Sequence, residues 1–384
     1  MRAVIGVDRP FHSAMLAHSL ANHGVEVSIH SAAPRRFYRG LSSGVRTRMV
    51  PAPLKMASYV LKFKLSGQLN LMDTVFFDRA VAATLGRPGV FIGWATQALH
   101  TAQLTKRRGG VFILDRACPH RDFQESLVER ERERLGVDSR PQPEWFRQRQ
   151  LEEYELAEAI LVPSEYTART FPEHLRPKLV KAPLLGRCAE PDVVRTEPNA
   201  EFTVGVVGGS PERKGYLYLL KAWKKLALPK AKLLIRSKGL TEYPALRELL
   251  ATIPNVEMVG YLPNISDFYQ RCDVFVLPSV DDGFGMALIE AMINGRACVA
   301  TSNTGATDLV EDGQDGLVID PADDEQLAAA VLRLYERAEL RIALGEAARV
   351  KARAIAASGL YDRAIASLLD RVRGGAAHSG YAAR

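Results

Sequence analysis

The stretch Val274-Phe-Val-Leu-Pro-Ser-Val-Asp-Asp-Gly-Phe-Gly-Met-Ala-Leu-Ile-Glu290 decides how this chain folds. Its apolar run, Val274–Leu277, predicts a buried strand, and a turn with two glycines leads into a helix expected from near Met286. Such a turn directs free backbone N–H groups and the positive end of the helix at whatever it holds, usually a phosphate. Glu290 lies about one turn inside the helix, where its carboxylate can accept hydrogen bonds from sugar or ribose hydroxyls.

Strands and helices alternate on both sides of this stretch. An apolar run over residues 3–7, helical spacing over 13–23 and alternation over 25–29 predict a βαβ start. The second half shows the same alternation of strand and helix, with a strand over 202–207 and an amphipathic helix over 214–227. The pattern predicts an α/β protein with two Rossmann-like domains, at 1–185 and 186–365, joined by a linker near 182–200. A helix end and frayed tail are expected over 366–384.

A second glycine-rich turn, Gly208-Gly-Ser-Pro-Glu-Arg-Lys-Gly215, follows the strand expected at 202–207. Its glycines let the backbone approach a phosphate, and Arg213 or Lys214 can neutralise one. Alone, this turn is equally consistent with a plain βα connection carrying solvated charges. Because the carboxyl ends of strands in open α/β sheets form the ligand site, its pairing with the Asp282–Glu290 segment favours phosphate binding.

The two turns together resemble the signature of retaining glycosyltransferases of family 4, which have the GT-B fold. That family shows an acidic residue, seven intervening positions and a Glu, and Asp282 and Glu290 have this spacing. The family also places an Arg and a Lys six residues apart to hold the donor diphosphate. Lys214 matches the Lys, whereas Gly208 stands at the Arg position, so Arg213 is a candidate to compensate.

The resemblance implies two Rossmann-like domains facing each other across a deep cleft, the N-terminal one binding the acceptor and the C-terminal one the nucleotide-sugar. Lys214 would hold the diphosphate, Glu290 the ribose, and the loop around Gly260 the base. It implies no metal and no cofactor beyond the nucleotide-sugar co-substrate. The predicted donor-binding residues are Gly209, Arg213, Lys214, Gly260, Tyr261, Gly283, Phe284, Gly285, Met286 and Glu290.

Four residues are predicted to take part in the chemistry. Asp282 would orient the transferred sugar. Asp115, Arg116 and His120 lie in Leu114-Asp-Arg-Ala-Cys-Pro-His-Arg-Asp-Phe-Gln124, after an apolar strand whose end faces the predicted cleft. A histidine can handle a proton near neutral pH, which places His120 first, although a lone His is more often structural.

Charge is distributed unevenly along the chain, whose net charge is +7. Residues 1–110 carry 15 Lys/Arg against 4 Asp/Glu. This basic half predicts either a solvated surface or attraction to an anionic partner such as a membrane face, a lipid phosphate or an acidic glycan. Residues 56–65, basic and apolar, fit a core helix or a membrane-surface segment. No nucleic-acid-binding motif is present.

Four scattered cysteines without CxxC spacing argue against a zinc site or disulfide framework and favour a cytoplasmic location. The basic N-terminal half adds peripheral contact with the inner membrane face as an alternative to a purely solvated surface. No apolar run reaches the 18 residues that a membrane-spanning helix needs. A dehydrogenase is excluded because the first βα turn, residues 7–13, lacks G-x-G-x-x-G. Two functions remain: a glycosyltransferase acting on an acceptor hydroxyl of a glycan, glycolipid or small molecule, and a catalytically silent sugar-nucleotide-binding protein of the same fold.

Overall fold

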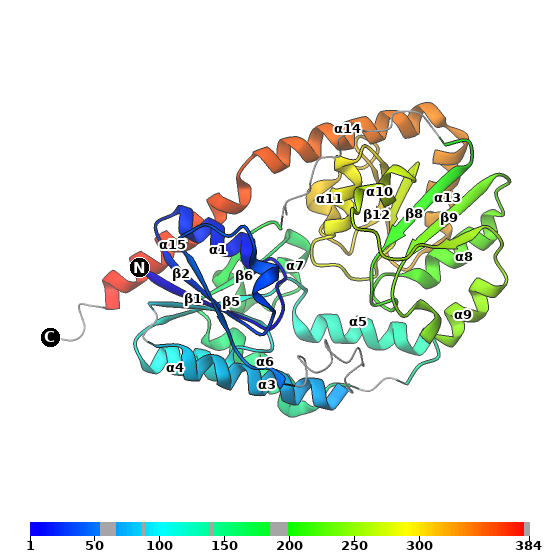
Figure 1. The fold of residues 1–384 in the computed structure, drawn as a ribbon. Coiled ribbons are helices and arrows are strands. Elements are labelled where there is room, and N and C mark those ends of the chain that lie inside the picture. Colours follow the sequence, from blue (N-terminus) through cyan, green and yellow to red (C-terminus); the bar gives the residue numbers. More distant parts are fainter. Residues whose placement is uncertain (54–66, 87–88, 139–140, 185–198, 380–384) are drawn as a thin grey trace.

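Two parallel β-sheets, one in each half of the chain, form the framework of the protein. The computed structural model describes residues 1–53, 67–86, 89–138, 141–184 and 199–379. Within these residues the N-terminal sheet has seven strands in the order β3-β2-β1-β4-β5-β6-β7, and the C-terminal sheet has six in the order β10-β9-β8-β11-β12-β13. The predicted α/β class and the two Rossmann-like units are confirmed (Figure 1).

The elements of the two halves have the following bounds. The first half contains β1 (Arg2–Val7), α1 (Ser13–Asn22), β2 (Glu26–Ser31), β3 (Val45–Met49), α3 (Gly67–Thr84), β4 (Val90–Trp94), α4 (Leu99–Arg107), β5 (Val111–Asp115), α5 (Arg121–Arg134), α6 (Glu144–Leu156), β6 (Ala159–Val162), α7 (Glu165–Arg169) and β7 (Leu179–Lys181). The second contains β8 (Phe202–Val207), α8 (Tyr216–Leu226), β9 (Ala231–Arg236), α9 (Pro244–Ala251), β10 (Val256–Met258), α10 (Ser266–Gln270), β11 (Val274–Leu277), α11 (Met286–Ile293), β12 (Ala297–Thr301), α12 (Ala306–Leu309), β13 (Leu317–Ile319), α13 (Asp324–Glu336), α14 (Ala338–Ala357) and α15 (Leu360–Ser379).

The central strands read as continuous apolar runs because helices cover both faces of each sheet. Every residue of β11 is buried, as is every residue of β4. Alternate residues of β9 pack into different cores: Leu233 and Ile235 lie in one apolar cluster, and Leu234 lies in the other. The two faces of β9 are therefore assigned, and with them the direction of the side chain at its end.

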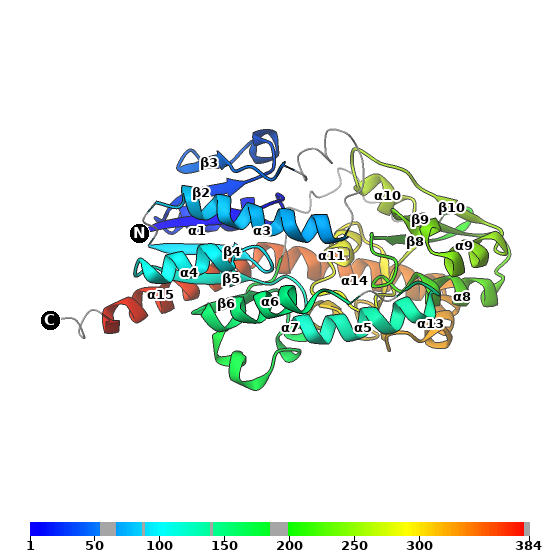
Figure 2. The same ribbon diagram turned by 90° about the horizontal axis from the view of Figure 1, so that it is seen from below.

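Helix α5 extends from the N-terminal domain to the C-terminal one (Figure 2). Its Glu131 carboxylate accepts a hydrogen bond from the Tyr218 hydroxyl of α8 at 2.8 Å, and Arg134 donates to the same hydroxyl at 2.6 Å. Leu135, just after the helix, belongs to the core of the C-terminal domain. This helix ties the two domains together on one side of the molecule.

The end of the chain also joins the two domains. A break at Gly359, whose φ is +64°, separates α14 from α15. Helix α14 packs on α11 and β12, and α15 packs on α1 and β7 of the N-terminal domain (Figure 1). Most of the predicted linker, and residues 56–65, lie outside the described residues, so the domain bounds and the membrane-surface segment stay predictions.

Candidate functional site

The turn between β11 and α11 has the predicted form. Gly285 adopts φ +76° and precedes the first residue of the helix, Met286. The Gly285 N–H donates to the Asp282 Oδ1 atom at 3.2 Å, and this hydrogen bond within the turn stabilises its conformation. The first N–H groups of α11 have no partner one turn earlier in the helix, so this end is suited to an anion.

Lys214 and Asp282 meet at this turn. The Lys214 ammonium forms an ion pair with Asp282, and both side chains are largely buried. Burial is the largest single effect on the Asp282 carboxyl and opposes its ionisation. The charge and hydrogen bond of Lys214, the Arg213 charge and the Gly285 N–H together outweigh burial, so the pKa of Asp282 lies below its ordinary value. The structure therefore brings together the predicted phosphate-binding cation and the first acidic residue of the spacing pattern.

Glu290 lies on α11, the helix that follows the turn. Its Oε2 atom accepts a hydrogen bond from the Tyr269 hydroxyl at 2.6 Å. Burial raises the pKa of Glu290 above its ordinary value, although the bond from Tyr269 acts in the opposite direction. A carboxylate held by one side-chain donor retains lone pairs for further hydroxyl donors.

Arg213, the candidate to compensate for the missing Arg at Gly208, is paired with a carboxylate of its own domain. Its Nε donates to the buried Asp281 carboxylate at 2.9 Å, and Gln124 of α5 donates to the same Oδ2 atom at 2.7 Å. The Tyr166 hydroxyl lies 3.4 Å from the other oxygen of Asp281. The Arg213 side chain is thus part of a polar contact between the domains, because its neighbours Gln124 and Tyr166 come from the N-terminal one.

Gly283 lies directly against the N-terminal domain. Its carbonyl oxygen accepts hydrogen bonds from the hydroxyls of Ser164 and of Thr167, the latter at 3.1 Å. A Cβ atom at this position would lie 2.2 Å from the Ala117 carbonyl oxygen, so only glycine permits the approach. The peptide at Gly283 is consequently an interdomain contact as well as part of the predicted donor loop.

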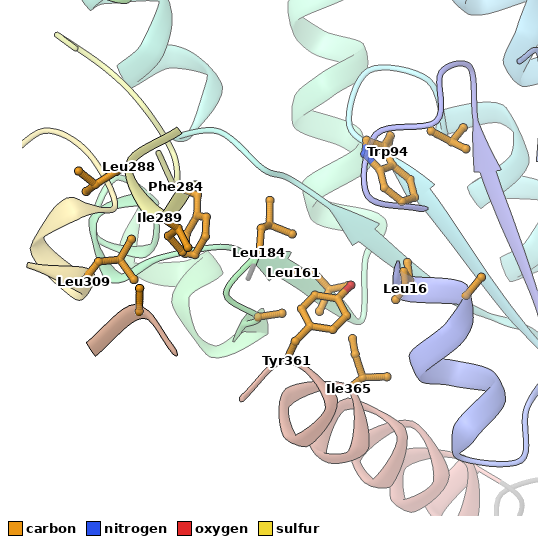
Figure 3. Close-up of a cluster of buried hydrophobic side chains, with 14 of the residues drawn as sticks. Leu16, Trp94, Leu161, Leu184, Phe284, Leu288, Ile289, Leu309, Tyr361 and Ile365 are labelled. Atoms are coloured by element: carbon orange, nitrogen blue, oxygen red, sulfur yellow. The ribbon is translucent and has the colours of Figure 1, made fainter. Parts of the chain in front are cut away.

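The other predicted donor-binding residues differ in exposure. Phe284 is buried and packs with Ile289 and Leu309, pointing into the apolar core beneath the turn (Figure 3). Its side chain anchors the turn, so only its backbone is available to a ligand. By contrast, Tyr261 is 82% exposed after β10, and Gly209 and Gly260 are also exposed.

The three candidates of the N-terminal domain are not brought together at one point. The Asp115 carboxylate accepts a hydrogen bond from His12 Nε2 at 2.8 Å. Arg116 donates to the Pro119 carbonyl oxygen at 2.9 and 2.7 Å, which braces its own loop. His120 lies against Tyr154 and Phe171 in a separate groove of about 500 Å³. Their catalytic roles stay predictions.

His120 serves as the N-cap of α5. Its Nδ1 accepts from the Asp122 N–H at 3.4 Å, and its own N–H donates to Thr170 Oγ1 at 2.8 Å. Burial lowers the pKa of His120 to about 4, so the imidazole is neutral at physiological pH. The structure thus gives His120 a clear capping role.

Two polar side chains at the strand ends escaped the sequence analysis. His12 pairs with Asp115 across 103 residues, and Arg236 ends β9 beside Gly208. The position of His12 shortly after the strand expected at 3–7 could have indicated it. A groove of about 420 Å³ between the domains is lined by Phe123, Tyr166, Arg169 and Thr170 on one side and Ser302, Asn303 and Thr307 on the other.

The described residues contain neither a candidate metal site nor a candidate membrane-spanning helix. No group of three or more His, Cys, Asp or Glu side chains there has the proximity to hold a metal ion. None of the helices in that part of the chain combines the length and apolarity required to cross a membrane. The prediction that the protein needs no metal or other cofactor is untested.

The segment that contains both glycine-rich turns is similar in sequence to known proteins. Residues 201–337 match the family described as glycosyl transferases group 1, and this segment contains both glycine-rich turns. The putative glycosyltransferase EpsD of Bacillus subtilis (strain 168) is 31% identical over 127 residues, which span 33% of this chain and 33% of EpsD. The similarity in sequence thus covers about a third of that relative.

Solved structures resemble the chain over nearly its whole length. Sucrose-phosphate synthase from Thermosynechococcus elongatus superposes with a TM-score of 0.72 at 18% identity, covering 97% of this chain and 99% of that one. Anabaena HepE, solved in complex with UDP-glucose, gives 0.69 at 16% identity, covering 96% and 100%. With its two Rossmann-like parallel sheets, the protein has the GT-B fold, as the resemblance implied.

Proposed function

We propose that the protein is a retaining glycosyltransferase that moves a sugar from a nucleoside-diphosphate-sugar to an acceptor hydroxyl. One observation carries the proposal: within the segment that matches group 1 glycosyl transferases, Lys214, Asp282 and the start of α11 meet at one turn. The HepE structure with UDP-glucose supports a donor of this class, because HepE shares the fold.

In the proposed reaction the bond between the anomeric carbon and the diphosphate oxygen breaks, and a bond to the acceptor oxygen forms. The acceptor proton leaves with the departing diphosphate. Lys214 and the N–H groups at the start of α11 stabilise the charge that develops on the leaving group. Glu290 accepts hydrogen bonds from the ribose, and Asp282 orients the transferred sugar once the diphosphate draws Lys214 away from it.

A turnover assay tests this function. The protein is incubated with UDP-, GDP- and ADP-sugars and candidate acceptors, while released nucleoside diphosphate and the anomeric configuration of the product are measured. We expect release with at least one donor and retention of configuration. Product of inverted configuration would contradict the retaining reaction.

A catalytically silent nucleotide-sugar-binding protein is the second candidate. It is favoured by Gly208, which stands where the family has its second phosphate-binding cation, and by the Asp282 pairing that occupies Lys214. Tight binding of a nucleotide-sugar without release of diphosphate, with every acceptor tried, would support it over the transferase.

We also propose that the acceptor side contacts an anionic membrane surface from the cytoplasm. The support is a patch made of the 3-10 helix Arg35–Tyr38 and β3, where Phe37 and Met49 are about half exposed. Five exposed cations lie in or next to the same two elements, and Arg36 lies over the Phe37 ring, an arrangement that suits an anionic interface. They are Arg35, Arg36, Arg39, Arg46 and Arg48. Sedimentation with phosphatidylglycerol vesicles but not phosphatidylcholine vesicles is expected, and equal behaviour with both would contradict the contact.

A further inference from the structure

Arg236 occupies the carboxyl end of β9, next to the glycine-rich turn after β8. Val207 is its partner in the parallel register, and the Gly208 N–H donates to the Arg236 carbonyl oxygen at 3.1 Å. The backbone that carries Arg236 is therefore hydrogen-bonded to the residue that stands where the family has its phosphate-binding arginine.

The side chain of Arg236 leaves β9 on the face that carries Glu290. Successive residues of a strand point to opposite faces, so Arg236 shares a face with Leu234. Leu234 lies in the same apolar cluster as Tyr269 and Ile289, whereas Leu233 and Ile235 belong to the cluster on the other face. Tyr269 donates to Glu290, and Ile289 precedes it, so the guanidinium lies on the Glu290 side.

The guanidinium is only partly satisfied. Its Nε atom is buried and has no hydrogen-bond partner among the described residues, and no ion pair of Arg236 is found there. Its charge nevertheless acts on Glu290, where it works to lower the pKa against the larger effect of burial. A buried N–H donor without an acceptor is unfavourable, so the arrangement is suited to an anion that completes it.

The two neighbouring cations are already engaged. Arg213 is held by Asp281, and Lys214 is paired with Asp282. A diphosphate carries more negative charge than one lysine can balance.

The backbone at position 208 does not readily accept a charged side chain in place of glycine. It adopts φ +154°, a conformation that side chains rarely adopt, and a Cβ atom there would lie 3.0 Å from the Lys214 side chain. A larger residue at 208 would therefore crowd Lys214. A cation delivered from the adjacent strand avoids this conflict.

We propose that Arg236 binds the diphosphate of the donor, in place of the arginine absent at Gly208. This inference rests on the proposed function, because it assigns a residue to the same donor site. It makes Arg236 and Lys214 the two cations around the phosphates, one from the end of β9 and one from the turn after β8. The guanidinium fork suits two phosphate oxygens at once.

Titration calorimetry with UDP, GDP and ADP, and with uridine, guanosine and adenosine, tests the proposal. Arg236→Gln, which keeps most of the side-chain volume, is expected to weaken the binding of the preferred diphosphate about 10- to 100-fold, as loss of a charge-assisted contact does. Binding of the matching nucleoside should change less than about 2-fold, because it has no phosphate. Lys238→Ala removes an exposed cation two residues further on and is the matched control.

The outcomes separate this inference from the function on which it rests. Wild-type binding of a diphosphate that is unchanged in Arg236→Gln overturns the role of Arg236 alone. An equal loss for nucleoside and diphosphate, or an equal loss in Lys238→Ala, also overturns it. If the wild-type protein binds no nucleoside diphosphate, the proposed function fails and the inference fails with it. Thermal melts of each variant establish that the protein tested is folded.

Discussion

Lys214 and Asp282 hold each other in place at the turn before α11. The pairing compensates two largely buried charges, which avoids the penalty for an isolated buried ion. A diphosphate that enters the turn competes with Asp282 for Lys214. The freed Asp282 carboxylate can then accept hydrogen bonds from the sugar that follows the diphosphate, so one exchange of partners would couple donor binding to orientation of the sugar.

His120 makes stability depend on pH. Burial holds the pKa of His120 at about 4 in the folded protein, whereas a histidine in the unfolded chain has a pKa of about 6.5. Between these two pH values the unfolded chain therefore binds a proton that the folded protein does not. Its contribution to stability is complete above pH 6.5 and is lost as the pH falls toward 4. Between pH 7 and 5 we expect His120 to account for a loss of about 1 to 2 kcal/mol in the free energy of unfolding.

Urea unfolding of His120→Asn at the two pH values measures this contribution. Asn can keep the cap acceptor of α5 while removing the titrating group. The variant should lose less stability on acidification than the wild type, with the remainder due in part to His30, whose pKa burial also lowers to about 4. His18→Asn, at an exposed site, should behave as wild type. The same pH dependence in His120→Asn and wild type would rule this explanation out.

At the scale of elements, two buried carboxylates cap the start of α4. Glu153 accepts the N–H groups of Thr96, Ala98 and Leu99 at 2.6, 2.9 and 3.0 Å. Asp78 accepts the next N–H groups of the same helix, at 2.7 and 3.0 Å. The donors that a helix start leaves unpaired are thus satisfied by α6 and α3, which lock α4 to both neighbours.

Glu153→Ala tests this cap. It leaves three backbone donors without their acceptor, so we expect the free energy of unfolding to fall by about 2 to 4 kcal/mol. Chemical denaturation measures the change. Glu152→Ala, at the exposed neighbouring position, should lie within about 0.5 kcal/mol of wild type. A small effect of Glu153→Ala would mean that water replaces the carboxylate without penalty.

Elements were more predictable than contacts between them. Val274–Leu277 is apolar throughout, so a buried strand followed by a glycine turn was readable, and β11 and α11 begin where expected. The sequence also indicated that the turns carrying Lys214 and Asp282 form one site, but the ion pair between these two side chains was not predicted. By contrast, the contact of Gln124 with Asp281, 157 residues apart, depends on packing between domains, and local sequence carries no signal for it.

At the scale of the whole molecule, the connections between the described parts of the two domains include α5, α15 and the peptide at Gly283. The last is the most sensitive to sequence, because an added Cβ atom would lie 2.2 Å from the Ala117 carbonyl oxygen, and backbone cannot move aside cheaply. The β11–α11 turn therefore has two roles. It faces the predicted donor, and it also sets the distance between the domains.

Gly283→Ala should separate the domains at this contact. Small-angle X-ray scattering is expected to give a larger radius of gyration than for wild type, and donor turnover should fall with it. Gly44→Ala, where an added Cβ meets nothing within 4 Å, is the control and should leave both unchanged. An unaltered scattering profile and full turnover in Gly283→Ala would show that the turn does not set the domain spacing.

The central claim is that a nucleoside diphosphate binds at the start of α11 against Lys214. Thermal unfolding of the wild type with UDP, GDP and ADP tests it most directly, since a ligand present at about 100 times its Kd stabilises the folded state by about 2.7 kcal/mol. We predict a rise in melting temperature with at least one of them, lost in Lys214→Ala and kept in Lys221→Ala, an exposed position on α8. No rise with any diphosphate, or an equal rise in Lys214→Ala, would contradict the claim.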